Sequence, residues 1–188
     1  MTIKKKEGLL RKSLLTGIIS ILLGILYFII FRFSTQDSEQ SGSLSRMVTE
    51  KCVEFMNILS GAHWSDVKMA GLAEYFEHPV RKLAHFSEYA CMGVLVYCLW
   101  SQWMRRGKAL VVLTVGWVFV SAAADEFHQY FVPGRYASIA DVLLDTCGGA
   151  FGVLFCICVT ALCQRWQRRR AEKKRLKHRK KDPKPTRK

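Results

Sequence analysis

Ionisable side chains crowd one short stretch of the chain, residues 125–145, which reads DEFHQYFVPGRYASIADVLLD. Its ionisable residues are Asp125, Glu126, His128, Arg135, Asp141 and Asp145. Carboxylates and imidazoles can exchange protons with a bound molecule, and a guanidinium can hold an anionic group. Long apolar runs lie on both sides of the stretch. Because a charge inside hydrocarbon costs roughly 2.5 kcal/mol or more, ionisable residues beside such runs usually mark a working site.

Helical spacing groups these residues into faces and adds a third segment, RKLAHFSEYA at residues 81–90. The sets are Arg81 with His85 and Glu88, then Asp125 with His128 and Gln129, then Ser138 with Asp141 and Asp145. Residues three, four or seven positions apart share a face of a helix. Lys82 lies on a face next to the first set. Because polar faces turned toward lipid are unfavourable, we expect three helix ends to turn them inward and form a pocket.

Four apolar blocks are long enough to position these groups as transmembrane helices. The sequence is 50% hydrophobic, and a helix needs roughly 20 mostly apolar residues to cross hydrocarbon. We predict spans at about 14–31, 83–104, 108–126 and 139–163. The first block is longer than the core of most secretory signals and lacks a small-x-small cleavage site, so we expect it to be retained. The sequence therefore predicts an all-α membrane protein with four transmembrane helices.

The distribution of basic residues predicts the orientation of these helices. The formal net charge is +14, and Lys and Arg concentrate before the first span, between the second and third, and after the fourth. Cytoplasmic loops of membrane proteins carry an excess of these residues. We therefore expect both termini in the cytoplasm and the polar pocket on the outer side.

The flanking segments are strongly basic. We expect residues 1–13 to be a cytoplasmic N-terminus, 14–164 the membrane domain and 165–188 a disordered cytoplasmic tail. Directly after a span, such a tail more often sets topology and contacts anionic lipid than binds nucleic acid. We expect membrane lipids, and no nucleic acid, as partners of this segment.

The predicted outer loop between the first two spans is long but carries helical patterns. Apolar residues recur at helical spacing over 44–59, which predicts an amphipathic helix capped by Ser43 or Ser45. Gly61 is expected to end it. A second short helix is expected over 66–77. The His78-Pro79 pair that follows is expected to end it.

The polar segments together resemble a known family. The matching pieces are FSTQDSEQSGSLS at 33–45, RKLAHFSEY at 81–89 and DEFHQYFVPGRYASIADVLLDTCGG at 125–149. The most specific piece is the last, with its D-E-x-x-Q-x-F-x-P-G-R core and trailing D-x-x-x-D-x-x-G. The chain resembles the VanZ-like family of bacterial membrane proteins, whose founding member is associated with resistance to teicoplanin-type glycopeptide antibiotics. The resemblance implies a small multi-pass protein of the bacterial cytoplasmic membrane; many members have Asn where this chain has Asp145.

We expect the pocket to bind an anionic lipid or a lipid-linked cell-envelope precursor and thereby to influence glycopeptide susceptibility. Arg and Lys side chains suit a phosphate, because Arg presents forked donors to its oxygens. The predicted ligand-binding residues are Arg81, Lys82, His85, Glu88, Asp125, Glu126, Gln129, Arg135, Ser138, Asp141 and Asp145. Candidates for acid or base are His85, Glu126, His128 and Asp141. Whether a reaction is catalysed is left open.

Other interpretations stay open at this point. An alternative is that the same residues form an internal ion-pair network that only holds helices together, in a structural protein that assembles with envelope enzymes. A small transporter is a further alternative, although the middles of the spans are apolar. We expect no cofactor and no metal, because the acidic residues lack a ligand motif and basic residues lie among them. Gly148 and Gly152 form a GxxxG pattern, which predicts close packing within the bundle or a homodimer.

Overall fold

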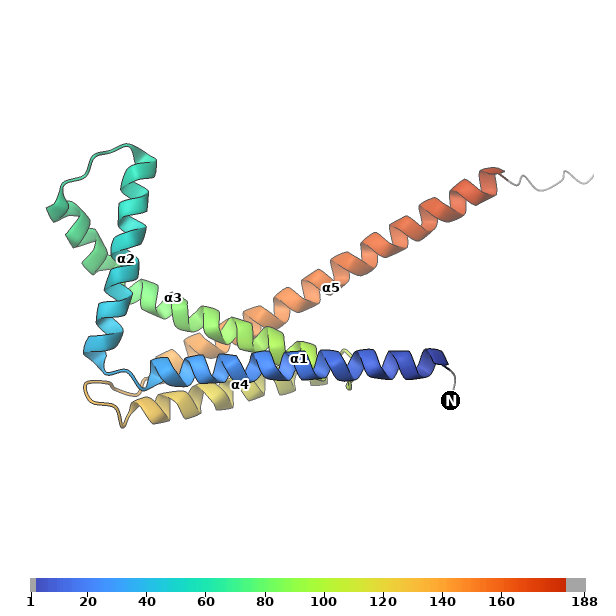
Figure 1. Cartoon of the computed structure of the whole chain (residues 1–188), viewed down its shortest axis with the longest axis horizontal. Coiled ribbons are helices and arrows are strands. Elements are labelled where there is room, and N and C mark those ends of the chain that lie inside the picture. The colour runs from blue at the N-terminus through green and yellow to red at the C-terminus, as the bar shows by residue number, and fades with distance from the viewer. Residues whose placement is uncertain (1–2, 182–188) are drawn as a thin grey trace, which may run out of the picture. The chain divides into compact units, whose positions relative to one another are not determined.

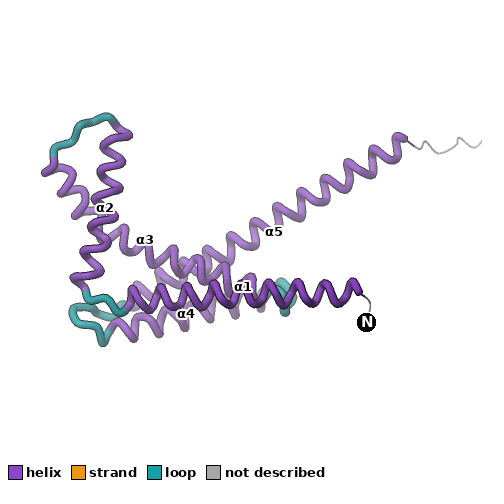
Figure 2. Tube along the Cα trace, in the orientation of Figure 1, coloured by secondary structure: helices purple, strands orange, loops and turns teal. Residues whose placement is uncertain are grey.

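The computed structural model describes residues 3–181 and shows helices joined by short loops (Figure 1). The helices are α1 (Ile3–Ser34), α2 (Ser38–Ser60), α3 (Asp66–Trp100), α4 (Lys108–Gln129) and α5 (Ile139–Lys181). The described residues contain no strand (Figure 2). The all-α prediction is therefore confirmed.

Four of these helices, α1, α3, α4 and α5, are long and apolar enough to cross a membrane. The predicted spans lie within them, with one difference at the end of the second. α3 ends at Trp100, and the residues up to Met104 form turns, since the amide of Trp103 bonds to the carbonyl of Trp100 at 3.0 Å. The sides on which the termini lie stay a prediction.

A small apolar core joins α1, α3, α4 and the start of α5. Its buried members are Ile30, Tyr89, Met92, Val96, Val118, Ala122 and Val142. Most other apolar side chains of the spans are exposed in the isolated chain; Ile21 and Val112, for example, are more than 60% exposed. This distribution suits helices surrounded by lipid, where outward-facing apolar residues are favourable.

The first turns of α5 pack closely against α3 through glycine. A Cβ on Gly148 would collide with the backbone carbonyl of Phe86, and one on Gly152 with that of Ala90. Small residues let two helix backbones approach in this way. The predicted close packing within the bundle is thus observed. A homodimer through the same glycines stays a prediction, although α3 covers them in the single chain.

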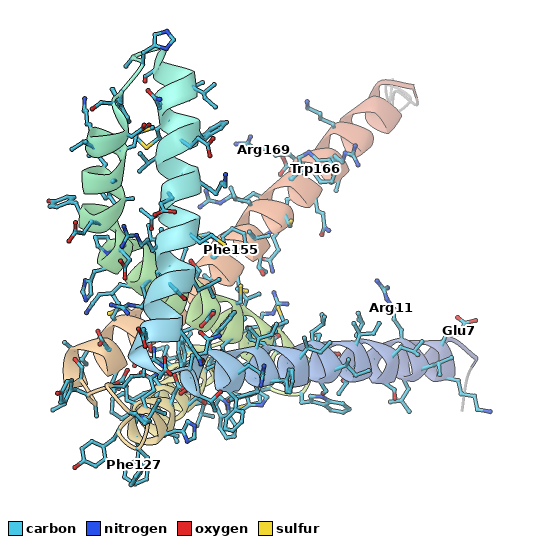
Figure 3. The ribbon with its side chains drawn as sticks, turned by 60° about the vertical axis from the view of Figure 1, so that its left-hand side comes forward. Glu7, Arg11, Phe127, Phe155, Trp166 and Arg169 are labelled. Carbon is cyan, nitrogen blue, oxygen red and sulfur yellow. The ribbon has the colours of Figure 1, made fainter. Side chains whose placement is uncertain are left out.

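α2 runs across the direction of α1 and contacts the first turns of α3 (Figures 1 and 3). Its cap is Asp37, which accepts from the amide of Gln40 at 2.7 Å, so the prediction of Ser43 or Ser45 as cap was wrong. The helix starts earlier because the side chains of both serines bond back to carbonyls within it. Gly61 ends α2 as predicted, in the left-handed conformation at φ 62°.

α3 does not end at His78-Pro79, as the sequence had predicted, but continues through Pro79 to Trp100. Proline removes one backbone donor and disfavours helix in the preceding residue, yet long membrane helices tolerate it through local adjustment. The consequence is that Arg81 and Lys82 extend from the middle of a continuous helix rather than from the start of a separate one.

The second compact unit of the chain begins at Leu154 and continues α5 as a helix to Lys181. Its apolar residues give way to aromatic and basic ones, and the guanidinium of Arg170 stacks 3.7 Å from the ring of Trp166, which Figure 3 labels. Disorder was predicted from residue 165, whereas residues 165–181 are helical. Lys, Arg and Glu are good helix formers and extend a helix that is already nucleated. The rest of the predicted disordered tail, 182–188, lies outside the described residues.

Candidate functional site

A polar cavity of about 320 Å³ opens where α3, the end of α4 and the start of α5 meet. Its lining residues are His78, Arg81, Lys82, His85, Glu126, Gln129, Gly134, Arg135, Tyr136, Asp141, Leu144 and Asp145. The volume is at the lower end of the range for small-ligand pockets, which begins at roughly 300 Å³. The cavity lies beside the middle of α3, the last turn of α4 and the first turns of α5, whereas the sequence had predicted a meeting of three helix ends.

Lys82 and Asp141 join α3 to the first turn of α5. The Nζ atom lies 2.5 Å from Oδ1, and the two side chains are 38% and 34% exposed. The pair satisfies one cation and one carboxylate of the cavity without a ligand.

Arg135 is aimed by the loop between α4 and α5. Pro133 and Gly134, the latter with φ 74°, occupy the central positions of a turn closed by the bond from the Arg135 amide to the Val132 carbonyl, at 3.2 Å. Positive φ at the second central position is the feature of a type II turn and favours Gly there. The P-G-R sequence therefore has a local reason: it turns the chain and presents the arginine.

The guanidinium of Arg135 caps the end of α1. Nη1 donates to the carbonyl oxygens of Phe33 and Ser34, both at 3.2 Å, and Nη2 lies 3.5 Å from Oγ of Ser41. The last carbonyls of a helix lack partners within it and carry partial negative charge, so a cation there is stabilising. Burial, followed by the nearby positive charge of Arg81, lowers the pKa of Arg135.

Glu126 and Ser138 connect the last turn of α4 to the first turn of α5. Glu126 is 6% exposed, and its Oε2 accepts from the amide of Ser138 at 2.8 Å. The hydroxyl of Ser138 in turn accepts from the amide of Asp141 at 3.3 Å, as an N-cap does. Ser138 was predicted to bind a ligand; here it caps α5 and does not line the cavity.

Arg81 differs from the other two cations of the cavity. Within residues 3–181 it makes no hydrogen bond and no ion pair, whereas Lys82 is paired and Arg135 caps a helix. Arg81 and Arg135 line the same cavity, and the charge of Arg81 helps to lower the pKa of Arg135. Arginine donors without acceptors next to a like charge favour the binding of an anion.

A model of the VanZ/LLP1 family matches residues 19–161, which include every residue of the cavity. The chain belongs to the VanZ/LLP1 family. The recognition made from the polar segments is thereby confirmed, and with the four apolar helices it makes this a multi-pass membrane protein. No curated protein and no solved structure matches the chain.

This VanZ/LLP1 protein carries a buried polar layer behind the cavity. Four enclosed atoms have no hydrogen-bond partner among the residues that the structure describes: His85 Nδ1, Glu88 Oε2, Tyr89 OH and Asp145 Oδ1. His85 Nδ1 and Glu88 Oε2 lie 3.7 Å apart, too far for a good hydrogen bond. Buried polar atoms without partners are rare and often mark functional positions. His85 and Asp145 reach the cavity wall, so they could exchange a proton with a bound molecule.

Some predicted residues lie beside the cavity rather than in its wall. His128 packs its ring 5.1 Å from that of Phe31 in α1, and Asp125 accepts from Gln129 within α4 at 3.0 Å. Among the residues the structure describes, no group of three or more His, Cys, Asp or Glu side chains converges as metal ligands.

Two polar wall residues were missed by the sequence reasoning. His78 and Tyr136 line the cavity, and Tyr136 is 88% exposed. His78 had been interpreted as the end of a helix, but in the continuous α3 it lies three and four positions before Arg81 and Lys82. The spacing rule would have found it once the proline was allowed inside the helix.

Proposed function

We propose that the polar cavity binds the phosphate of an anionic lipid or of a lipid-linked cell-envelope precursor. The observation that carries the proposal is Arg81, a cavity cation that has no hydrogen bond or ion pair among the described residues and lines the same cavity as a second guanidinium, Arg135. A phosphate between them would relieve the like-charge repulsion and accept forked hydrogen bonds from Arg81.

A lipid is favoured over a soluble phosphate by the position of the cavity. Its walls come from the last turn of α4, the first turns of α5 and the middle of α3, three helices that also carry exposed apolar surfaces, so we propose that a ligand in it lies at headgroup depth. The basic segments predict that this end of the bundle is the outer one. Binding of an envelope precursor there would influence susceptibility to glycopeptide antibiotics, as the family resemblance implies.

Lipid analysis of the purified full-length chain tests the proposal. We expect an anionic phospholipid or lipid-linked precursor to co-purify with the wild type and to be lost in Arg81→Gln. A matched control is Arg46→Gln, because Arg46 lies exposed on α2 and pairs only with Glu50 at 3.1 Å. The proposal fails when Arg81→Gln retains as much of the lipid as Arg46→Gln does.

The structural alternative also has specific support. The Lys82–Asp141 pair, the cap of α1 by Arg135 and the bond from Ser138 to Glu126 all hold helices together. Under this alternative the cavity is a by-product of polar contacts that hold the helices together. Arg81, which has no hydrogen bond or ion pair among the described residues, is then dispensable. Arg81→Gln would then change neither lipid content nor teicoplanin susceptibility in cells that produce the protein.

A further inference from the structure

A second, apolar cavity adjoins the polar one. It has a volume of about 140 Å³ and lies between α2, α3 and the end of α1. Five of its twelve lining residues have apolar side chains, namely Phe33, Leu44, Val48, Val80 and Ala84. Three residues line both cavities and so form the junction between them: Arg81, His85 and Arg135.

We infer that the ligand is an amphiphile whose hydrocarbon passes from the Arg81–Arg135 junction into the apolar cavity between α2 and α3. The inference rests on the proposed function and adds to it the path of the hydrocarbon. A phosphate at the junction would face the cations on one side and an apolar cavity on the other. A phosphate ester with an attached alkyl chain has this same division of polar and apolar parts.

Two hydroxyl groups in the wall of the apolar cavity are already bonded within the protein. Ser45 donates to the carbonyl of Ser41 at 2.7 Å, and the Ser41 hydroxyl lies within 3.5 Å of Arg135. The carboxylate of Glu88 also lies in the wall, and its Oε2 is enclosed 3.7 Å from Nδ1 of His85. A hydrocarbon chain that enters therefore leaves the two hydroxyls bonded, whereas burying each of them without a partner would cost roughly 1–3 kcal/mol.

The outer wall of this cavity gives a route to the bilayer. Leu44 and Val48 on α2 are 38% and 43% exposed, so the cavity opens past them to the surface of the helix. Further along α2 several exposed residues are also apolar, including Phe55 and Met56. A chain longer than the cavity can continue along this surface into lipid.

Isothermal titration calorimetry of the full-length protein in a non-ionic detergent distinguishes the contribution of the ligand's headgroup to binding from that of its acyl chains. The probes are dihexanoyl phosphatidate, which has acyl chains, and glycerol 3-phosphate, which lacks them. We expect the wild type to bind the phosphatidate at least tenfold more tightly. Val48→Trp and Ala84→Phe fill the apolar cavity and should remove that preference while glycerol 3-phosphate still binds, which also shows that the variants are folded.

The matched control is Ile58→Trp, which adds comparable bulk to α2 at a residue that lines neither cavity. It should bind both probes as the wild type does. Equal affinity of the wild type for the two probes, or a preference that survives both cavity-filling variants, overturns the inference and leaves the proposed phosphate site standing. The proposed function is overturned as well if neither probe binds, or if Arg81→Gln does not weaken the binding.

Discussion

The Nζ atom of Lys82 lies 2.5 Å from Oδ1 of Asp141, across 59 positions of the sequence. The pair fixes the first turn of α5 against the middle of α3, at the rim of the polar cavity. Because about a third of each side chain is exposed, solvent weakens the attraction, and such pairs contribute roughly 0.2–1 kcal/mol. The pair therefore sets the shape of the rim more than the stability of the protein.

Exchanging the two charges tests whether the pair is only structural. Lys82→Asp and Asp141→Lys should each lower the melting temperature by a few degrees, and the double variant should restore it and retain the lipid. We expect this because Arg81 and Arg135 are proposed to hold the phosphate. Thermal unfolding and lipid analysis give both readouts. Restored stability without restored lipid would show instead that Lys82 or Asp141 contacts the ligand.

Removal of the Glu126 side chain should destabilise the junction of α4 and α5. Glu126→Ala leaves the amide of Ser138 without its acceptor, which costs roughly 1–3 kcal/mol, whereas Glu126→Gln keeps an acceptor oxygen and should cost less. Unfolding of the detergent-solubilised protein measures the difference. Glu50→Ala, at an exposed pair on α2, is the control and should change stability by less than about 0.5 kcal/mol. Equal losses in all three variants would contradict a specific role for the Glu126–Ser138 bond.

Adding a methyl group to Gly152 should disturb the contact of α5 with α3. Its Cβ would meet the backbone of Ala90, which cannot rotate away as a side chain can, so we expect a loss of about 1–3 kcal/mol. Gly17→Ala in α1 is the control, because a Cβ there meets nothing within 4 Å and alanine favours helix. Its stability should be unchanged or slightly higher. A tolerated Gly152→Ala would contradict the packing described above.

Substitutions of Arg135 and of Arg81, the two arginines of the junction, should differ in their effects on stability. Arg135→Gln removes donors to the carbonyls of Phe33 and Ser34 and should lower stability by roughly 1–3 kcal/mol. Arg81→Gln removes no hydrogen bond or ion pair with the described part of the chain. Its free energy of unfolding should stay within about 0.5 kcal/mol of the wild-type value. Both variants should lose the lipid. The melting temperature together with lipid content distinguishes them, and a large loss of stability in Arg81→Gln would show that this residue has a structural role.

Much of the architecture follows from patterns that are local in the chain. Uncharged blocks near 20 residues predict spans, and intervals of four residues place Arg81 with His85 and Asp141 with Asp145 on single faces. The Pro-Gly pair predicts the turn before Arg135, and Gly61 predicts the end of α2. These signals suffice because each depends only on neighbouring residues and on the exclusion of polar groups from hydrocarbon.

The errors in prediction come from competition between local signals. Pro79 was expected to end a helix, but α3 absorbs the loss of one donor and continues. Asp37 rather than a serine caps α2, because the hydroxyls of Ser43 and Ser45 bond to carbonyls of the preceding turn. Each case has two chemically reasonable outcomes, and the packing of the neighbouring helix selects one.

The sequence by itself determined a four-span helical protein of the VanZ-like kind with a polar cluster at one end of its spans. Only the tertiary structure decided which of those polar residues have partners within the protein. Lys82 pairs with Asp141, Arg135 bonds to the end of α1, and Glu126 bonds to Ser138. It also showed that Arg81 is left without a partner in the described chain, beside an apolar cavity that no pattern predicted. The physical reason is that partner choice depends on distances between helices distant in sequence, and these are set by glycine contacts and turns acting together.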